Sequence, residues 1–440
     1  MWGPNLSESC PSKSQSTEPI EIFIMPSPSE TLYQPSSNMP VPISQDHTLH
    51  FFADPCLPLA VVVANTRWDE PPRMRHDVTR QLIRFCNVVF VEFFPAGERG
   101  DRKHEWVSVS ERLIILSPTD RFRVPPRLRA NIPWVHARCN MHYAREIQEA
   151  VRGISCNTRI LFNFVYDFRE ITQLPDFDWS CYICFDEFPR MQRRAYRRNY
   201  IKSKYHEWLF QRYENDVARG SSCCLTPHFP LRDKLTEVNG QVHMFHHAHN
   251  FPNSLMDIPR RSSGKIHVGF AGYINYRILL DWLVELMKDP AIVLHLIGPK
   301  DGPELEKLND FPNLQRVPPL AGKAYFDKLL EMDVLIMPYD PSIPEVNILT
   351  TNSKFFQCIA TTRPLVISDL PHYMKMPPGV IYRASNQREF VEKVRLAYCE
   401  DSDDLRKLRS DIAAENTWDK RGEQLHGYLK EALGDRIPEL

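Results

Sequence analysis

The sequence predicts an α/β protein made of two doubly wound, Rossmann-like domains in tandem. At 440 residues the chain exceeds what one ordinary core accommodates, so two domains are expected. Short apolar runs alternate with helical stretches in two series, separated by the segment 251–264, which is rich in Pro, Ser, Asn and Arg. Such alternation predicts parallel sheets with helices on both faces. The composition agrees, because 42% hydrophobic and 25% charged residues are typical of globular proteins.

The N-terminal segment differs from the rest of the chain. Residues 1–50 contain eight prolines and ten serines without sustained periodicity. A segment of this composition buries too little apolar surface to offset the entropy of ordering it, so residues 1–55 are expected to form a disordered tail. The segment shows no secretory signal, and apolar runs such as Leu57–Ala64 are far shorter than the roughly 20 residues of a membrane-spanning helix.

Charge and cysteine content narrow the classes of partner and compartment. Lys plus Arg number 54 and Asp plus Glu 55, so the formal charge of -1 gives no reason to expect nucleic acid as a partner. The eleven cysteines are scattered and odd in number, which is typical of reduced thiols in a cytosolic protein. A cytoplasmic protein is therefore expected.

The first series of apolar runs predicts an N-terminal Rossmann-like domain over residues 56–250. Continuous apolar runs are typical of strands that are buried on both faces. Helices are expected over Arg73–Cys86, around Tyr143–Val151, and along a stretch that ends near Ala218. The expected strands are Leu59–Asn65, Asn87–Phe94, Arg112–Leu116, Arg159–Val165, Trp179–Glu187 and Ser221–Thr226.

The second series predicts another domain of the same kind over residues 265–415, followed by a C-terminal helix within 416–440. Residues 251–264 are expected to form the linker between the two domains. The expected strands are Lys265–Gly272, Ala291–Gly298, Asp333–Tyr339 and Pro364–Ser368.

One stretch of the second domain combines a strand, a glycine turn and a helix start. Gly269 and Gly272 end the apolar run, and Arg277 lies where the next helix begins. Backbone amides at such a turn are free to face an anion, and glycine lets a diphosphate approach the chain closely. The alternative, that the glycines only form a tight turn, stays open at this point.

Ligands of open α/β sheets bind beyond the carboxyl ends of the strands, so the residues that follow the other strands are candidates for the same site. Lys354 could neutralise a diphosphate there, and Gln357, about one helical turn further on, could bond ribose hydroxyls. The remaining candidates at these strand ends are Gly298, Val317 in the loop Val317–Gly322, Tyr339 and Ser353.

From Val268 to Leu425 the sequence resembles the donor-binding half of retaining glycosyltransferases with the GT-B fold, in particular glycosyltransferase family 4. The likeness is to bacterial cell-surface polysaccharide enzymes of the teichuronic-acid type. It rests on five segments in the family's order: "VGFAGYINYRILLDWL", "LHLIGPKD", "LQRVPPLAGKAYFDKLLEMDVLIMPY", "NSKFFQCIATTRPLVISDLP" and "ENTWDKR".

This resemblance implies transfer of a sugar from a nucleotide-diphosphate donor to an acceptor hydroxyl, with retained configuration. It implies no cofactor and no catalytic metal, because cationic side chains neutralise the leaving diphosphate. By the family pattern Gly269, Gly272, Arg277 and Lys354 hold the diphosphate. The loop that contains Val317 flanks the base, while Ser353 and Gln357 lie near the ribose and phosphates.

In the first domain the segment Arg67–Glu92 is similar to the family's opening loop and helix. The resemblance implies that His76 and the flanking Trp68, Arg73 and Arg75 approach the sugar and the acceptor. It also places Asp186, in "CFDEFPR", near the junction of the domains. The alternative for His76 is a packed or solvated histidine.

Three residues depart from the family pattern. Gln357 stands where a glutamate is usual, Leu349 replaces the paired glutamate eight residues earlier, and Thr362 replaces a glycine; Glu345 lies close by at another spacing. These departures leave two alternatives to a glycosyltransferase of bacterial surface polysaccharide: an impaired GT-B-like scaffold or nucleotide-sugar sensor, and a nucleotide-sugar epimerase.

Two further patterns bear on partners. The segment Phe188–Trp208 carries seven Arg or Lys with interleaved aromatics, which could contact an anionic membrane at its cytoplasmic face or a lipid-linked glycan acceptor. The alternative is a solvated helix face. The histidines of "HHAH" (246–249) and the pair Cys181 and Cys184 offer no four-ligand zinc set, so no metal site is expected.

Overall fold

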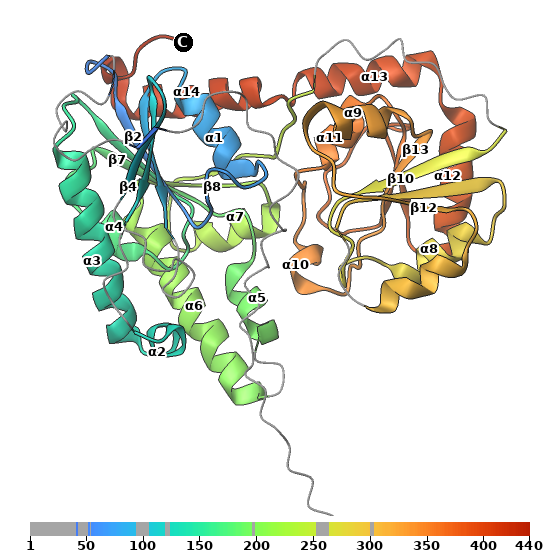
Figure 1. Cartoon of the computed structure of the whole chain (residues 1–440), viewed down its shortest axis with the longest axis horizontal. Coiled ribbons are helices and arrows are strands. Elements are labelled where there is room, and N and C mark those ends of the chain that lie inside the picture. The colour runs from blue at the N-terminus through green and yellow to red at the C-terminus, as the bar shows by residue number, and fades with distance from the viewer. Residues whose placement is uncertain are drawn as a thin grey trace, which may run out of the picture.

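The computed structural model describes residues 41–42, 52, 54–93, 105–118, 124–195, 199–251, 264–299 and 303–440. Nearly all of the tail expected at 1–55 lies outside these residues, as does most of the linker expected at 251–264. Figure 1 shows two lobes, each containing a sheet, with helix α14 crossing from the second lobe to the first.

The described part of the first lobe contains a nine-stranded sheet in the order β1-β4-β5-β3-β2-β6-β7-β8-β9. All pairs from β5 to β9 are parallel, and only the edge strands β4 and β1 are antiparallel. The strands are β1 (Val41–Pro42), β2 (Leu59–Ala64), β3 (Asn87–Glu92), β4 (Glu105–Ser110), β5 (Leu113–Ser117), β6 (Arg159–Asn163), β7 (Trp179–Ile183), β8 (Cys223–Thr226) and β9 (Val242–Met244).

Helices cover both faces of this sheet, and two apolar clusters fill the layers between them. Residues of β2 and β3 are buried along their whole length, as expected of strands between two helical layers. The helices are α1 (Met74–Leu82), α2 (Pro126–Asn131), α3 (Pro133–Arg152), α4 (Arg169–Thr172), α5 (Phe188–Ala195), α6 (Tyr200–Gly220) and α7 (Phe229–Thr236).

The described part of the second lobe contains a six-stranded, all-parallel sheet in the order β12-β11-β10-β13-β14-β15. Its strands are β10 (Ile266–Ala271), β11 (Ile292–Ile297), β12 (Leu314–Val317), β13 (Val334–Met337), β14 (Leu365–Ser368) and β15 (Ile381–Ala384). Its helices are α8 (Leu280–Met287), η2 (Pro303–Asp310), α9 (Gly322–Leu330), α10 (Pro344–Asn347), α11 (Phe355–Ala360), α12 (Gln387–Glu400) and α13 (Asp403–Ala414).

The predicted fold class, two Rossmann-like α/β units, is confirmed. The strand order also fixes where ligands should bind. In each sheet the order reverses once, between β2 and β6 in the first and between β10 and β13 in the second. The loops that follow these strands are therefore the expected binding positions.

The chain returns to the first lobe at its end. Helix α14 (Trp418–Leu433), followed by η3 (Gly434–Arg436), packs against α1, and Trp418 and Leu425 belong to the first lobe's core. At this crossing the His249 amide donates to the Asn416 carbonyl at 3.2 Å, and the Trp418 amide donates to the His249 carbonyl at 3.0 Å. The two lobes are thus joined by packed elements as well as by the segment 252–263.

Thr362 has an unusual backbone conformation, with φ of 62°. It lies two residues after the end of α11, and its carbonyl accepts a hydrogen bond of 2.7 Å from the buried guanidinium of Arg409. A residue with a Cβ pays about 1 to 2 kcal/mol in this left-handed region, whereas glycine pays almost nothing. The departure from glycine noted in the sequence therefore stores strain in the backbone.

Replacing Thr362 by glycine is expected to raise the free energy of unfolding by up to about 1 kcal/mol, after the greater entropy of unfolded glycine is subtracted. Thr362→Ala keeps the Cβ and serves as the matched control, with no such gain. Urea denaturation of both variants checks this, and equal or lower stability of the glycine variant would show that the conformation is not strained.

Candidate donor site at the carboxyl ends of the second sheet

Two glycine turns and a lysine meet beyond β10 and β11. Gly272 has φ of 150°, and a Cβ built there would lie 2.5 Å from Cε and 2.7 Å from Nζ of Lys354. Gly298 has φ of 135°, and its Cβ would lie 2.2 Å from the carbonyl oxygen of Gly272. Both positions therefore require glycine, and the absence of side chains places the Lys354 ammonium directly against the first turn.

Gly269 has a different role. It lies inside β10, where a Cβ would be 2.5 Å from Cγ of Met332. Close packing of the strand against Met332 accounts for glycine at this position. Gly269 is thus in the core, and only Gly272 of the predicted pair lies at the strand end.

Arg277 lies in the loop that follows this turn, facing the first lobe. The loop is fixed by bonds from the amide of Asp340 to the Arg277 carbonyl and from the Arg277 amide to Asn275. Burial would lower the pKa of Arg277, but the negative charge of Asp186 and the hydroxyl of Tyr276 more than offset it. The guanidinium is therefore held charged at the junction of the lobes.

Lys354 is a second cation at the same place. Its pKa is lowered, first by burial and then by the nearby charge of Arg277, with Cys358 acting in the opposite direction. Among the described residues no carboxylate lies within ion-pair distance of either cation. Two close cations, neither of them in a direct ion pair with a described carboxylate, form an anion-binding arrangement that suits a diphosphate.

The other predicted donor-side residues differ in whether their polar groups already have hydrogen-bond partners. The Gln357 Oε1 atom accepts a hydrogen bond of 3.1 Å from the hydroxyl of Tyr325. The Val317 carbonyl accepts the amide of Gly298 at 3.0 Å, so this backbone group already has a partner. Ser353 is exposed, and burial raises the pKa of the Tyr339 hydroxyl.

His76 lies apart from this site, inside the first lobe. It is 0% exposed, its Nδ1 accepts the amide of Arg73 at 3.1 Å, and its Nε2 donates to the carbonyl of Arg67 at 2.9 Å. Burial, with neighbouring arginine charges adding to it, lowers its pKa to about 4. Both ring nitrogens are occupied and the ring is neutral, which corresponds to the packed alternative, so His76 is not part of the proposed machinery.

Trp68 and Arg73 support the same helix start. The Trp68 amide donates to Glu92 at 2.8 Å, and its ring lies under the guanidinium of Arg80 at 5.6 Å. Arg73 is exposed and pairs with Glu70 at 3.4 Å. These contacts fix the loop that follows β2, one of the two strands that flank the reversal point of the first sheet.

Among the predicted acceptor-side residues, Arg75 is the one whose buried guanidinium lacks a hydrogen-bond partner at Nε. It is 5% exposed, its Nε has no hydrogen-bond partner, and its guanidinium lies 5.2 Å from the ring centre of Phe185. Burial, together with Arg73, lowers its pKa to about 9. A buried guanidinium without a carboxylate within ion-pair distance among the described residues is costly, and an anion could offset that cost.

Asp186 comes from the first lobe and faces Arg277 in the second. Its Oδ1 accepts the amide of Glu187 at 2.9 Å. Burial raises its pKa to about 6, although Arg277 acts in the opposite direction. The carboxylate and the guanidinium mark the point where the two lobes meet at their carboxyl edges.

The raised pKa of Asp186 predicts a pH effect on stability. Folding favours its protonated form, so its contribution to the free energy of unfolding is complete below the unfolded pKa, about 4, and is lost as pH rises through 6. Asp186→Asn imitates the protonated acid. Relative to the wild type, this variant is expected to be more stable at pH 7.5 than at pH 4.5, which urea denaturation at both values checks. A stability difference that does not change with pH would contradict this assignment.

A buried ion-pair network holds the loop that carries Asp186. Lys234 on α7 donates to Glu187 at 2.8 Å and to Glu214 at 2.7 Å, while Glu214 also accepts from the Tyr182 hydroxyl at 3.0 Å. Sequence reasoning did not identify this network, because its members are 47 and 20 residues apart and share no motif.

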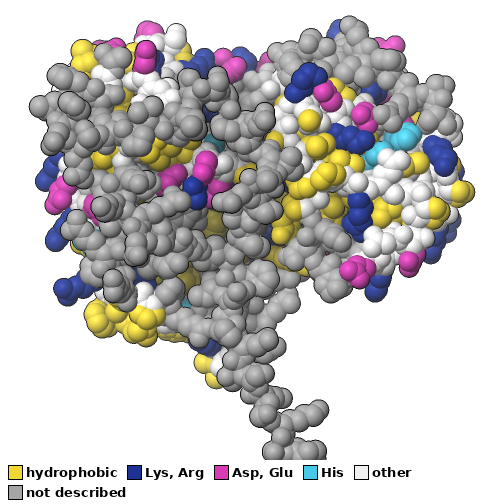
Figure 2. Space-filling model, in the orientation of Figure 1, with side chains coloured by type: hydrophobic (Ala, Val, Ile, Leu, Met, Phe, Trp, Pro, Cys, Tyr) yellow, Lys and Arg dark blue, Asp and Glu magenta, His cyan; other side chains and the backbone are white. Residues whose placement is uncertain are grey.

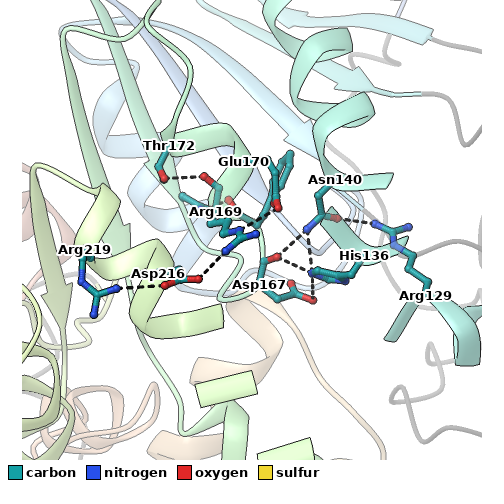
Figure 3. Close-up of polar contacts among 11 residues, drawn as sticks. Arg129, His136, Asn140, Asp167, Arg169, Glu170, Thr172, Asp216 and Arg219 are labelled. Carbon is teal, nitrogen blue, oxygen red and sulfur yellow. Dashed lines mark hydrogen bonds and ion pairs between the residues drawn. The ribbon is translucent and has the colours of Figure 1, made fainter. Parts of the chain in front are cut away.

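Another network that the sequence did not indicate lies beyond β6, at the first sheet's reversal point. Figure 3 shows Arg129 donating to Asn140 at 3.0 Å, and Asn140 donating to the carbonyl of Asp167 at 2.7 Å. His136 contacts the same carbonyl at 2.9 Å and stacks on Tyr213 at 4.5 Å. The loop that follows β6 is thereby fastened to α2, α3 and α6.

The same loop is anchored on its other side by charges. Arg169 pairs with Asp216 of α6 at 2.7 Å and with Glu170 at 3.2 Å, and Arg219 contacts Asp216 at 3.2 Å (Figure 3). Helix α4, at the end of this loop, is thereby fastened to α6.

No group of three or more His, Cys, Asp or Glu side chains suited to a metal ion occurs among the described residues. In the same part of the chain, no helix combines the length and apolar character needed to cross a membrane.

Comparisons with known proteins show which solved structures share this fold. No protein-family model matches the sequence, and no curated protein matches it. Solved structures do match: a trehalose-6-phosphate synthase from E. coli bound to UDP-2-fluoroglucose is 10% identical, with a TM-score of 0.60 over 85% of this chain and 99% of that one. The chain has the GT-B fold.

Two further structures with this architecture extend the comparison. The UDP-forming trehalose-phosphate synthase of Burkholderia vietnamiensis is 10% identical, with a TM-score of 0.59 over 86% of this chain and 98% of that one. HepE of Anabaena in complex with UDP is 9% identical, with a TM-score of 0.56 over 85% and 100%. At such identity the GT-B fold is what the chain shares with them.

Proposed function

We propose that this GT-B protein transfers a sugar from a nucleoside-diphosphate donor to an acceptor hydroxyl, with retained configuration. The observation that carries the proposal is the pair of cations, Arg277 and Lys354, beside the glycine turn at Gly272, with no carboxylate within ion-pair distance of either among the described residues. A nucleoside diphosphate supplies the missing charge. The structural neighbours that hold UDP or a UDP-sugar support the same ligand class.

In this proposal the chain's own cations do the work of a metal ion. Negative charge grows on the leaving diphosphate as its bond to the sugar breaks, and Arg277 and Lys354 lie where they would stabilise it. The acceptor hydroxyl approaches from the first lobe, where Asp186 and Arg75 lie. Family 4-like chemistry without a metal or cofactor follows from this arrangement as a proposal.

The acceptor is proposed to be a glycan or lipid-linked glycan of a bacterial surface polysaccharide. Arg75 supports an acceptor that carries an anionic group, because its buried guanidinium has no carboxylate partner within ion-pair distance among the described residues. Cytoplasmic location at the inner face of the membrane is part of the same proposal.

A second candidate, an impaired sugar-nucleotide sensor, is favoured by one observation. The Gln357 Oε1 atom is already bonded to Tyr325, and a neutral amide binds ribose hydroxyls more weakly than a carboxylate does. Incubation of the protein with radiolabelled nucleotide sugars and membrane-extracted glycans separates the two. Sugar incorporation supports the transferase, and tight donor binding without incorporation or hydrolysis supports the sensor.

Membrane contact is proposed through an exposed apolar patch at the end of the first lobe. Trp134 on α3 is 70% exposed, and Ile201 and Trp208 on α6 are 81% and 56% exposed. Figure 2 shows hydrophobic side chains at this end of the lobe. Other members of the patch are Leu128, Tyr200 and Tyr205, and the neighbouring cations on α6 are Lys202, Lys204 and Arg212.

The double variant Ile201→Ser, Trp208→Ser is expected to bind vesicles containing phosphatidylglycerol at least about tenfold more weakly, because each lost side chain removes roughly 1.5 to 3 kcal/mol of apolar transfer. Leu396→Ser, on the second lobe and also exposed, is the matched control. Sedimentation with vesicles measures the partitioning. Equal partitioning of the double variant and the control would refute the membrane role.

A further inference from the structure

Four histidines lie where the first lobe meets the loop before α11, and three of them, His228, His246 and His249, form hydrogen bonds with backbone groups. The Nδ1 atom of His228 accepts the amide of Thr350 at 3.1 Å. The Nδ1 atom of His246 donates to the carbonyl of Pro227 at 3.0 Å. These rings therefore have structural partners.

His249 is committed in the same way, and His247 is not. His249 donates from Nε2 to the carbonyl of Ala413 at 2.9 Å and accepts the Phe251 amide at Nδ1 at 3.0 Å. His247 is 9% exposed, and its Nδ1 is buried without a hydrogen-bond partner. Its ring lies 6.1 Å from that of His228, so it belongs to the same junction.

Two neighbouring threonines on the other side of the junction show the same contrast. The Thr350 hydroxyl accepts the amide of Phe229 at 2.9 Å, which joins the two lobes. The Thr351 hydroxyl is buried and has no partner. Thr351 lies three residues before Lys354, in the loop that ends at that cation. Unpaired buried groups on both lobes at one junction indicate a missing ligand.

The surroundings of His247 show which charge is missing. Burial lowers its pKa to about 3, and every neighbouring group that adds to the shift is basic: His246, Arg421 and Lys354. Arg421 is anchored by bonds to the His246 carbonyl at 3.0 Å and to Asn416 at 2.7 Å. Among the described residues no acidic side chain acts on the pKa of His247, so an anion would be attracted to this position.

We infer that His247 and Thr351, from opposite lobes, bind a phosphoryl group together with Lys354. On the proposed function, which this inference takes as its basis, the phosphoryl group is one of the two in the donor diphosphate. A neutral imidazole N–H, a threonine hydroxyl and an ammonium are all donors, and phosphoryl oxygens are acceptors. Because the ligands come from both lobes, diphosphate binding ties the lobes together at the side where α14 crosses.

Calorimetric titration of the full chain with UDP, GDP and ADP, and separately with inorganic pyrophosphate and the free nucleosides, tests this inference. His247→Phe keeps the ring volume and removes the donor, and Thr351→Val removes only the hydroxyl. His243→Phe is the matched control, because His243 belongs to the same segment but stacks on Tyr428, at 4.8 Å. The His247 variant is expected to bind the preferred diphosphate about tenfold more weakly, with unchanged affinity for the nucleoside and an unaffected control.

The possible results separate the inference from the proposed function. Diphosphate binding that depends on Lys354 but is the same in the wild type, His247→Phe and Thr351→Val would overturn the inference and leave the function standing. Pyrophosphate binding that depends on His247, without binding of any nucleoside diphosphate, would support the site and overturn the function. Binding of neither probe would overturn both.

Discussion

Lys354→Met is expected to lower kcat/KM for sugar transfer at least about 100-fold. Methionine has nearly the same length as lysine but no charge, and loss of one preorganised contact to a leaving group typically costs this much. The glycine turns at Gly272 and Gly298 keep their conformation in the variant. Steady-state transfer with the preferred donor measures the effect.

The same substitution is expected to stabilise the unliganded chain, because burial and the neighbouring Arg277 both disfavour the lysine's charge. Activity and stability should therefore change in opposite directions, as happens when a site keeps unfavourable charge for binding. Lys323→Met, at an exposed position on α9 where the lysine pairs with Asp327, is the matched control. Transfer activity within fivefold of the wild type would remove Lys354 from the site.

Lys234→Met is expected to lower the free energy of unfolding by about 3 to 5 kcal/mol. It leaves the buried carboxylates of Glu187 and Glu214 without their shared cation, and removal of one partner from a buried ion pair costs this much. Because Glu187 is next to Asp186, the loop at the junction should loosen as well. Guanidinium denaturation measures the loss.

The control is Lys204→Met, whose lysine forms a surface pair with Glu207 one turn away on α6. Exposed pairs of this kind contribute only about 0.3 to 0.5 kcal/mol, so this variant should unfold almost like the wild type. A Lys234 variant as stable as the Lys204 variant would show that the network does not hold the first lobe.

The sequence predicted the sheets well because their central strands are continuous apolar runs. Strands β2, β3, β10 and β11 all lie within the runs that were expected to form them. The strands that were not predicted are β1, which lies within the tail expected at 1–55, and β4, β9, β12 and β15. They are short or lie toward sheet edges, and β12 has two exposed residues between two half-buried ones, a pattern that carries little apolar signal. Local patterns thus indicate a strand only where both faces are covered.

Prediction of the site followed the same logic and had the same limit. Strand ends and glycines located Gly272, Gly298 and Lys354, because chain direction determines which edge of a parallel sheet they reach. Gly269 and His76 matched the same patterns, yet packing accounts for both. A side chain's burial and hydrogen-bond partners depend on contacts remote in sequence, and no motif encodes them.

His247 shows this limit most clearly. In the sequence it is one of three histidines within four residues, which suggested only a metal site without enough ligands. The structure distinguishes it from its neighbours by the absence of a hydrogen bond to its buried Nδ1. That distinction arises from Thr350, Pro227 and Ala413, which occupy the other rings and belong to distant segments.

The cation pair beside Gly272 is expected to bind a nucleoside diphosphate. Isothermal titration of the full chain with UDP, GDP and ADP in the absence of magnesium tests it most directly, with Arg277→Ala as the comparison. One of the three is expected to bind to the wild type, and the variant is expected to bind it at least about tenfold more weakly. Binding of none of them, or equal binding by the variant, would contradict it.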